Sequence, residues 1–364
     1  MSSASYLELV MVFSAALSLT WFIIFFHRRS KHLQSRLGDL QAVQAAHTSP
    51  VPRVGGIAVF AALVFGILII LGEHLYATFY VKLLLSSLPI FVVGLSEDLG
   101  FFASPKLRLL ATALSGLVFV ALLGQWLPKI GLAWIDMPMK WAPFAIGFSL
   151  FVGVGVCHAF NLIDGVNGFS ALIGISASLA LATISHQQGL TDHRDSLIIL
   201  SVSIAGFLVF NFPFGRIFLG DAGAYLIGHI SVWTAISILW MAPQVSPFAV
   251  LLIFFWPIAD TFLAIVRRLM YGTSVSKPDR LHFHQLVMRT LQITFLGRNQ
   301  RRLANPLTTI IMLPFAMCPI ISGVLLSLDN IKAAIAVIVY FLLFGSTYYV
   351  NRLVVLKLRG VIKV

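Results

Sequence analysis

Carboxylate side chains are the residues of this sequence whose types and positions could do chemistry. The 364-residue chain is 59% hydrophobic and has only thirteen Asp and Glu. A carboxylate in near-apolar surroundings is costly, so one that is found there indicates a function. For any single carboxylate at a helix end, capping is an equally good explanation. Six of them, however, lie at or beside predicted helix ends on one side of the protein: Glu97, Asp98, Asp164, Asp221, Asp260 and Asp279.

Two of these acids are adjacent in the chain. Glu97 and Asp98 repel each other unless a cation lies between them, so the pair indicates a metal ion or a proton acceptor. Lys106 and Arg108 bring the opposite charge nearby. The alternative is a loop at the membrane surface whose charges are solvated.

The stretch from residue 161 to residue 168 has amide and acid side chains at a spacing of three, at Asn161, Asp164 and Asn167. On a helical turn this spacing places Asn161 and Asp164 on one face, and the glycines let a ligand approach the backbone. Mg²⁺ prefers oxygen ligands and takes few of them from the protein when phosphates and water complete its shell. The alternative is a turn rich in Asn and Asp, but such a turn does not explain why the Asp164 carboxylate lies at the membrane boundary.

A second stretch, Asn211 to Gly223, leads into a predicted helix that begins near Asp221. The free N–H groups of a helix start can bind an anion, and the Asp221 carboxylate can bind a metal. Phe218, three residues earlier, could stack on a nucleobase, although a Phe beside a membrane span more often packs against its neighbours.

Two loops supply groups for phosphate. Arg53 follows Pro50 and Pro52, which fix an extended approach to a predicted helix. In the second loop, His282 and His284 alternate and so point the same way, near Arg280. Too few acidic or thiol side chains lie beside them for a zinc site, so contacts to a pyrophosphate are the better prediction. Solvated loop histidines remain the alternative.

The elements that must position these residues are membrane-spanning helices. The chain has a mean hydropathy of +0.95 and only 10% charged residues, and a span needs about 20 apolar residues whose backbone groups are all paired. We therefore predict an all-α polytopic membrane protein. About eleven transmembrane helices are expected, near residues 6–26, 54–72, 78–95, 107–124, 143–158, 167–185, 196–212, 222–240, 247–266, 307–327 and 332–350.

The distribution of charge predicts the orientation of this protein. With the N-terminus in the periplasm and the C-terminus in the cytoplasm, 20 of the 25 Lys and Arg fall on the cytoplasmic side, as the positive-inside rule requires. The net charge of +12 then reflects topology and contact with membrane lipids, and no nucleic-acid-binding motif is present. We expect a single multi-pass domain, 1–364, in a bacterial inner membrane. The loops expected to form its cytoplasmic active-site face are 27–53, 96–106, 159–167, 213–221 and 267–306.

Together these stretches resemble the polyprenyl-phosphate N-acetylhexosamine-1-phosphate transferases, the superfamily of MraY- and WecA-like enzymes in glycosyltransferase family 4. The resemblance covers nearly the whole chain and is closer to the WecA-like branch. The matching pieces, in order, are Pro52–Gly56, Gly94–Arg108, Asn161–Gly168, Asn211–Gly223, Asp260–Arg268 and Asp279–Gln285.

The resemblance implies a reaction and roles for these residues. N-acetylhexosamine 1-phosphate would pass from a UDP-sugar to undecaprenyl phosphate, giving a lipid-linked diphosphosugar and UMP. Asp221 and Asn161 would hold Mg²⁺, with Mn²⁺ as an alternative. Phe218 would stack on uracil and Asn167 would read the uracil edge.

The remaining roles concern the phosphates and the acceptor. Lys106, Arg280, His282 and His284 would hold the diphosphate or the sugar, and Arg53 is a further candidate for a phosphate contact. Asp98, with Glu97 and Asp164, would orient or deprotonate the acceptor phosphate.

Some positions depart from the bacterial pattern of the superfamily. Glu97 replaces an Asp, Asn167 replaces a common Asp, and Gln285 stands where a third His is often found. The last change argues against the pentapeptide-bearing donor of peptidoglycan synthesis. We expect a plain UDP-N-acetylhexosamine that serves lipopolysaccharide O-antigen, capsule or another surface glycan in cell wall biogenesis.

Other classes of protein are weaker predictions. A transporter of an anionic substrate would show matching halves with broken helices at the membrane midplane, and no internal repeat is evident. A CDP-alcohol phosphotransferase would need a motif that is missing. A purely structural subunit has no use for the acidic cluster. A homodimer is left open by the sequence.

Overall fold

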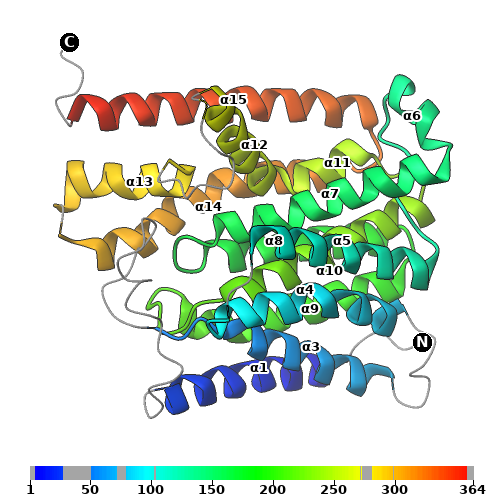
Figure 1. The fold of residues 1–364 in the computed structure, drawn as a ribbon, viewed down its shortest axis with the longest axis horizontal. Coiled ribbons are helices and arrows are strands. Elements are labelled where there is room, and N and C mark those ends of the chain that lie inside the picture. Colours follow the sequence, from blue (N-terminus) through cyan, green and yellow to red (C-terminus); the bar gives the residue numbers. More distant parts are fainter. Residues whose placement is uncertain are drawn as a thin grey trace.

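The computed structural model describes residues 5–27, 51–71, 79–101, 104–270, 272, 281–297 and 299–358. All regular structure in these residues is helical, as predicted (Figure 1). The helices are α1 (Tyr6–His27), α3 (Gly55–Leu71), α4 (Phe79–Asp98), α5 (Pro105–Leu123), α6 (Ala133–Met139), α7 (Ala142–Ile163), α8 (Phe169–Gln187), α9 (Thr191–Asn211), α10 (Gly220–Met241), α11 (Pro247–Ile253), α12 (Phe255–Met270), α13 (Phe283–Leu291), α14 (Arg301–Leu325) and α15 (Asn330–Leu358), and a short π-helix, Gln292–Leu296, follows α13.

The predicted membrane spans coincide with helices. Nine helices of the described residues are long and apolar enough to cross a membrane, namely α1, α4, α5, α7, α8, α9, α10, α14 and α15. The pair α11 and α12 passes the same test when its two helices are taken together, and the second predicted segment, 54–72, is the shorter helix α3. The protein is therefore a multi-span membrane protein. Two of the eleven predicted segments differ from a single long helix: 54–72 is shorter and 247–266 is bent.

The predicted span 247–266 is wrong as a single straight helix. It consists of α11 and α12, which meet at Phe254 at an angle of 81°. Pro257 lies in the first turn of α12, where its missing N–H costs little but where it cannot continue a preceding helix. Hydropathy reports apolar length alone, so it could not reveal this bend.

Helix α10 lies at the centre of the bundle. All of its apolar span is buried by protein, and it packs against α3, α4, α7 and α8. Small residues permit this close packing. A side chain on Gly94 of α4 would place its Cβ 2.8 Å from the Cα of Ala222. The first turn of α10 is therefore held directly against the last turn of α4.

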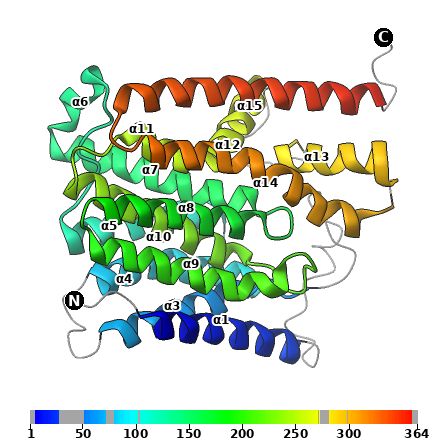
Figure 2. The same ribbon diagram turned by 180° about the vertical axis from the view of Figure 1, so that it is seen from behind.

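The two ends of the bundle carry different connections. Both ribbon views place α6 at one end and α13, with the turn between α7 and α8, at the other (Figures 1 and 2). The second end is called the site end below, and the first is called the far end. Which end faces the cytoplasm remains a prediction from the charge distribution, as do the positions of the two termini relative to the membrane.

Candidate active site

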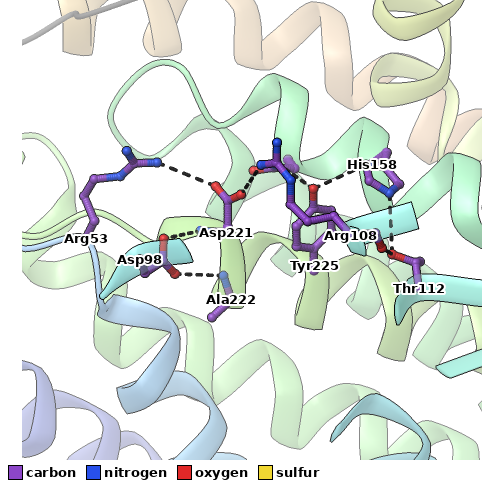
Figure 3. Close-up of polar contacts among 9 residues, drawn as sticks. Arg53, Asp98, Arg108, Thr112, His158, Asp221, Ala222 and Tyr225 are labelled. Carbon is purple, nitrogen blue, oxygen red and sulfur yellow. Dashed lines mark hydrogen bonds and ion pairs between the residues drawn. The ribbon is translucent and has the colours of Figure 1, made fainter. Parts of the chain in front are cut away.

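Four charged side chains from four separate segments meet at the site end. Arg53 precedes α3, Asp98 ends α4, Arg108 lies in the first turn of α5 and Asp221 lies in the first turn of α10. Figure 3 shows Arg53 and Arg108 approaching the Asp221 carboxylate from opposite sides. Residues more than 100 positions apart in the chain are thus brought together by the packing of the first turn of α10.

The Asp221 carboxylate is held by two guanidinium groups. Arg108 Nη1 donates to Asp221 Oδ2 over 2.7 Å, and Arg53 Nη2 lies 3.6 Å from Oδ1. Asp221 is buried, whereas the Arg53 side chain is 39% exposed. A guanidinium presents several donors in a planar fork, so these arginines can bind a phosphate oxygen beside Asp221.

The Asp98 carboxylate caps α10 from a neighbouring helix. Asp221 N–H donates to Asp98 Oδ1 over 2.8 Å, and Ala222 N–H donates to Oδ2 over 2.9 Å. The first N–H groups of a helix have no partner within it, and a carboxylate there also interacts favourably with the helix dipole. The structure thus shows that Asp98 caps a helix, and its role toward the acceptor stays a prediction.

The segment before α3 pairs with the segment before α10 through their backbones. Phe218 N–H donates to Pro52 O over 2.8 Å, and Gly55 N–H returns a bond of 2.9 Å to Phe218 O. Gly220 then adopts a φ of 76°, and a side chain there would collide with Arg53 O. Only glycine combines this conformation with so close an approach. The pairing places the backbone of Phe218, whose side chain is partly buried, beside the segment that carries Arg53.

A chain of polar contacts extends from Asp221 into the bundle. Tyr225 lies one turn further along α10, where its Oη accepts a bond of 3.0 Å from Asn161 Nδ2. The same oxygen lies 3.3 Å from His158 Nδ1, and His158 Nε2 lies 3.5 Å from Thr112 Oγ1. Asn161 is thus beside the Asp221 turn, as its predicted role with Asp221 requires.

Asp164 lies at the end of α7, outside the membrane-spanning segments, and faces the same cluster. Surrounding protein desolvates its carboxylate and raises the pKa to about 7; Arg53 opposes this shift and Asp221 adds to it. Three of the predicted acids, Asp98, Asp164 and Asp221, therefore lie around Arg53.

The Asn167 side chain is buried and holds neighbouring loops together. Its Nδ2 donates to Pro213 O over 3.0 Å, whereas its Oδ1 has no hydrogen-bond partner. Two side chains of α14 hold its backbone, because Asn305 Oδ1 accepts from Asn167 N–H and Thr309 Oγ1 donates to Asn167 O, both over 2.7 Å. The adjacent Gly168 N–H donates to Asn211 Oδ1 over 2.7 Å.

A pair of stacked histidines lies beside this loop, and one of them, His284, packs against it. The rings of His282 and His284 are stacked, with centroids 5.8 Å apart and planes at 11°. A side chain on Gly165 would collide with the His284 ring, so that imidazole lies directly on the 164–168 turn. Burial lowers the pKa of His284 to about 4, which keeps it neutral at pH 7. His282 Nδ1 lies 2.8 Å from a carboxylate oxygen of Asp260.

Other predicted residues are placed less centrally. Lys106 is exposed and lies two positions before Arg108 on α5; positions two apart on a helix do not face the same way, so Arg108 is the residue of this pair that contacts Asp221. Glu97 is partly exposed and interacts electrostatically with Arg108. Arg280 lies outside the described residues.

Several residues of the site were not singled out from the sequence. Tyr225 could have been found, because it lies four positions after Asp221 and hence on the same helix face. His158, Asn305 and Thr309 lie in apolar helices and carried no local signal. Their polar partners come from other helices, so only the packing reveals them.

The residues present fit a Mg²⁺ ion that takes few ligands from the protein and the rest from the phosphates of the substrate and from water. Among the described residues, no three His, Cys, Asp or Glu side chains are placed to enclose a metal ion. Asp221 offers a carboxylate, and Asn161, which contacts Tyr225 one turn further along α10, offers an amide oxygen. Mg²⁺ commonly takes one or two protein carboxylates and completes its octahedron with water and phosphate oxygens.

Comparisons with known proteins assign the family. The sequence model of glycosyl transferase family 4 matches residues 79–239, the part that contains α4 to α10. An undecaprenyl-phosphate alpha-N-acetylglucosaminyl 1-phosphate transferase of Yersinia pestis is 30% identical over 273 residues, which cover 72% of this chain and 73% of the relative. The chain belongs to this family.

Further relatives agree with this assignment. A decaprenyl-phosphate N-acetylglucosaminephosphotransferase of Mycobacterium tuberculosis is 30% identical over 302 residues, which cover 74% of this chain and 72% of the relative. A probable undecaprenyl-phosphate N-acetylglucosaminyl 1-phosphate transferase of Bacillus subtilis is 26% identical, over 71% of this chain and 72% of the relative. The predicted superfamily of polyprenyl-phosphate N-acetylhexosamine-1-phosphate transferases is thereby confirmed, and a transferase is favoured over a transporter.

Proposed function

We propose that this membrane protein transfers N-acetylglucosamine 1-phosphate from UDP-N-acetylglucosamine to undecaprenyl phosphate, releasing UMP. The observation that carries the proposal is the Asp221 carboxylate held between Arg53 and Arg108, at the helix start that Asp98 caps, in a chain of this family. The names of the relatives support the choice of sugar and of polyprenyl acceptor.

The cluster has the properties that phosphoryl transfer requires. Such a reaction depends mainly on positioning and on neutralising the negative charge that spreads over the phosphoryl oxygens. Arg53 and Arg108 supply fixed positive charge, and the first turn of α10 adds its dipole. Asp221 and Asn161 would hold Mg²⁺, which supplies further charge neutralisation on the diphosphate when bound.

The uridine of the donor would lie against the loop before α10. Phe218 is fixed there by its backbone bond to Pro52, and its ring can stack on a base. Because the Asn167 side chain is buried, we propose that it reads the uracil edge through its unpaired Oδ1 while its Nδ2 holds Pro213. Lys106 and Arg280 would contact the diphosphate.

Three carboxylates are available to the acceptor side of the reaction. Both oxygens of Asp98 accept backbone N–H bonds, which favours a positioning role over proton abstraction. Little deprotonation is needed, since a phosphomonoester with a second pKa near 6 is mostly dianionic at neutral pH. Glu97 and Asp164 would orient the phosphate with Arg53.

The proposed product places the protein at the start of a surface polysaccharide. A sugar diphosphate on a polyprenyl anchor is a substrate for further glycosyl transfer at the membrane. The excess of Lys and Arg in the loops predicted to be cytoplasmic supports an inner-membrane enzyme whose active site faces the cytoplasm, where nucleotide sugars are made.

The test is UMP release by purified protein in detergent, given undecaprenyl phosphate, Mg²⁺ and a panel of UDP-N-acetylhexosamines. We expect release that requires the acceptor, is greatest with UDP-N-acetylglucosamine and is abolished by EDTA. Folded wild-type protein that releases no UMP with any donor would overturn the proposal.

A matched pair of variants makes the test specific. Asp221→Asn removes the carboxylate charge at the site, and Asp329→Asn removes one at the far end, where Asp329 pairs with Lys332 on the surface. We expect the first variant to lose activity and the second to keep it. Equal activity of both would contradict the assignment of the site.

A further inference from the structure

Asp260 is a buried carboxylate whose task the proposed reaction leaves unexplained. It lies on α12, beyond the 81° bend, and is 2% exposed. Its Oδ1 accepts from Phe283 N–H over 2.9 Å, and its Oδ2 lies 2.8 Å from His282 Nδ1. One oxygen therefore caps the start of α13, and the other holds an imidazole.

This contact determines where the hydrogen of His282 lies. An ionised carboxylate can only accept hydrogen bonds, so His282 Nδ1 must donate. In the neutral imidazole, Nε2 is then an acceptor. His282 Nε2 is buried and has no hydrogen-bond partner in the structure. Buried polar atoms are nearly always paired, so this nitrogen points to a ligand.

A second unpaired atom lies in the first turn of α13, for which His282 is the N-cap residue. Gln285 Oε1 is also buried without a partner, and the side chains of the N-cap and N3 residues of a helix are neighbours. Both atoms are acceptors, whereas diphosphate oxygens offer no hydrogen to them. Hydroxyl and acetamido N–H groups of a sugar are donors. The missing ligand is therefore better described as a sugar than as a pyrophosphate.

The position of the two acceptors agrees with such a ligand. The His284 ring, on which His282 stacks, lies against Gly165, next to Asp164, which interacts with Arg53 and Asp221. A sugar bound here would adjoin the cluster that we assign to the donor diphosphate. This inference rests on the proposed function for the identity of the donor.

We propose that Asp260 is a positioning residue that fixes the His282 tautomer, so that His282 Nε2 and Gln285 Oε1 accept hydrogen bonds from the transferred sugar. Asp260 itself touches no substrate.

The first experiment compares Asp260→Asn with Asp136→Asn. Asparagine at position 260 still accepts from Phe283 N–H, but it offers its own N–H to His282 Nδ1 and so reverses the tautomer. Asp136 is a matched control, because its Oδ1 likewise accepts backbone N–H groups, from Ile130 over 2.7 Å and Gly131 over 3.1 Å, at the far end.

Binding of UDP-N-acetylglucosamine and of UDP is measured with Mg²⁺, together with the kinetics of both substrates. For Asp260→Asn we expect about tenfold weaker binding of the sugar nucleotide, as for the loss of one buried hydrogen bond, with UDP binding and the KM for undecaprenyl phosphate unchanged. Asp136→Asn should change none of these. Equal loss for UDP and the sugar nucleotide, or no loss for either, would overturn the proposal.

A double-variant cycle separates positioning from a structural role. His282→Asn keeps an N–H near the position of Nδ1 and removes Nε2. We expect it to match Asp260→Asn, and the double variant to be no worse than His282→Asn alone. Additive losses would show that Asp260 acts independently of His282 and would overturn the proposal.

A spectroscopic measurement reads the tautomer without relying on activity. The ¹⁵N spectrum is recorded on protein whose histidines are ¹⁵N-labelled. The His282 signals are identified as those that are present in the wild type and missing from the His282→Asn variant. We expect hydrogen on Nδ1 in the wild type and on Nε2 in Asp260→Asn, and an unchanged tautomer would contradict the inference. If the wild type neither binds UDP-N-acetylglucosamine nor releases UMP, the proposed function fails, whereas the tautomer result still tests the role of Asp260.

Discussion

The two ends of α10 both carry polar clusters, and the clusters differ in how completely their groups are paired. At the far end, His193 Nε2 lies 2.6 Å from Ser237 Oγ, which donates to Gln125 Oε1 over 2.5 Å. At the site end, Arg53 and Arg108 from separate segments converge on the single carboxylate of Asp221.

The ion pairs of the two ends also differ. At the far end, Arg194 pairs with its own chain neighbour Asp195 over 2.7 Å. At the site end, the pair between Arg108 and Asp221 joins residues 113 positions apart. An ion pair between chain neighbours stabilises the fold locally, whereas two arginines that come from separate segments to one carboxylate can also bind an anion. The following predictions test this difference, beginning with the largest effect on activity.

Asp221→Asn should have the largest effect. Loss of the carboxylate removes the predicted metal ligand and leaves two guanidinium groups without their partner, so we expect kcat to fall at least about 10³-fold. Circular dichroism should show unchanged helix content. The measurement is UMP release at saturating substrates, and a decrease of less than tenfold would contradict a central role for Asp221.

Arg108→Lys should have the next largest effect. Lysine keeps the charge but not the planar fork that reaches Asp221 Oδ2, so we expect kcat/KM for the donor to fall about 10- to 100-fold. Arg194→Lys at the far end is the control and should stay within about twofold of the wild type. If both substitutions have the same effect, the distinction between the two ends is wrong.

Asn305→Ala should have a smaller effect that falls on substrate binding. The substitution leaves the Asn167 N–H without its acceptor, which costs about 1–3 kcal/mol of local stability. We therefore expect the KM for the donor to rise several-fold, with a smaller change in kcat.

A threonine on the same helix provides the control. The Thr308 hydroxyl donates to Ala304 O of its own helix over 2.7 Å, so Thr308→Ala should leave the donor KM unchanged. Steady-state kinetics over a range of donor concentrations give the donor KM of each of the two variants for comparison. An unchanged KM for Asn305→Ala would mean that the 164–168 turn does not depend on α14.

Ser237→Ala should leave activity unchanged and lower stability. It removes the hydroxyl that bridges His193 and Gln125, so a buried imidazole nitrogen loses its partner at a cost of about 1–3 kcal/mol. Thermal unfolding in detergent should show a lower Tm while kcat/KM stays within about twofold. A loss of activity without a change in Tm would show that the far end takes part in the reaction.

Much of the fold could be predicted from the sequence because it depends on local pattern. Apolar length identified the positions of the eleven helical segments, and the family followed from short motifs in a fixed order. Asp98, Asp164 and Asp221 were predicted to share one face, and the structure places all three around Arg53. These properties follow from hydropathy and from the residues at helix ends, and both can be read from each segment of the sequence separately.

The tertiary structure decided which side chains meet. The sequence placed both Lys106 and Arg108 near the acids, and only the packing of α5 shows that Arg108 contacts Asp221. Asp98 lies 123 positions before the N–H that it caps, and Asp260 contacts His282 from α12, which turns away from α11 by 81°. Such contacts depend on how helices cross and bend, and no local pattern of residues encodes a crossing between segments that are distant in the chain.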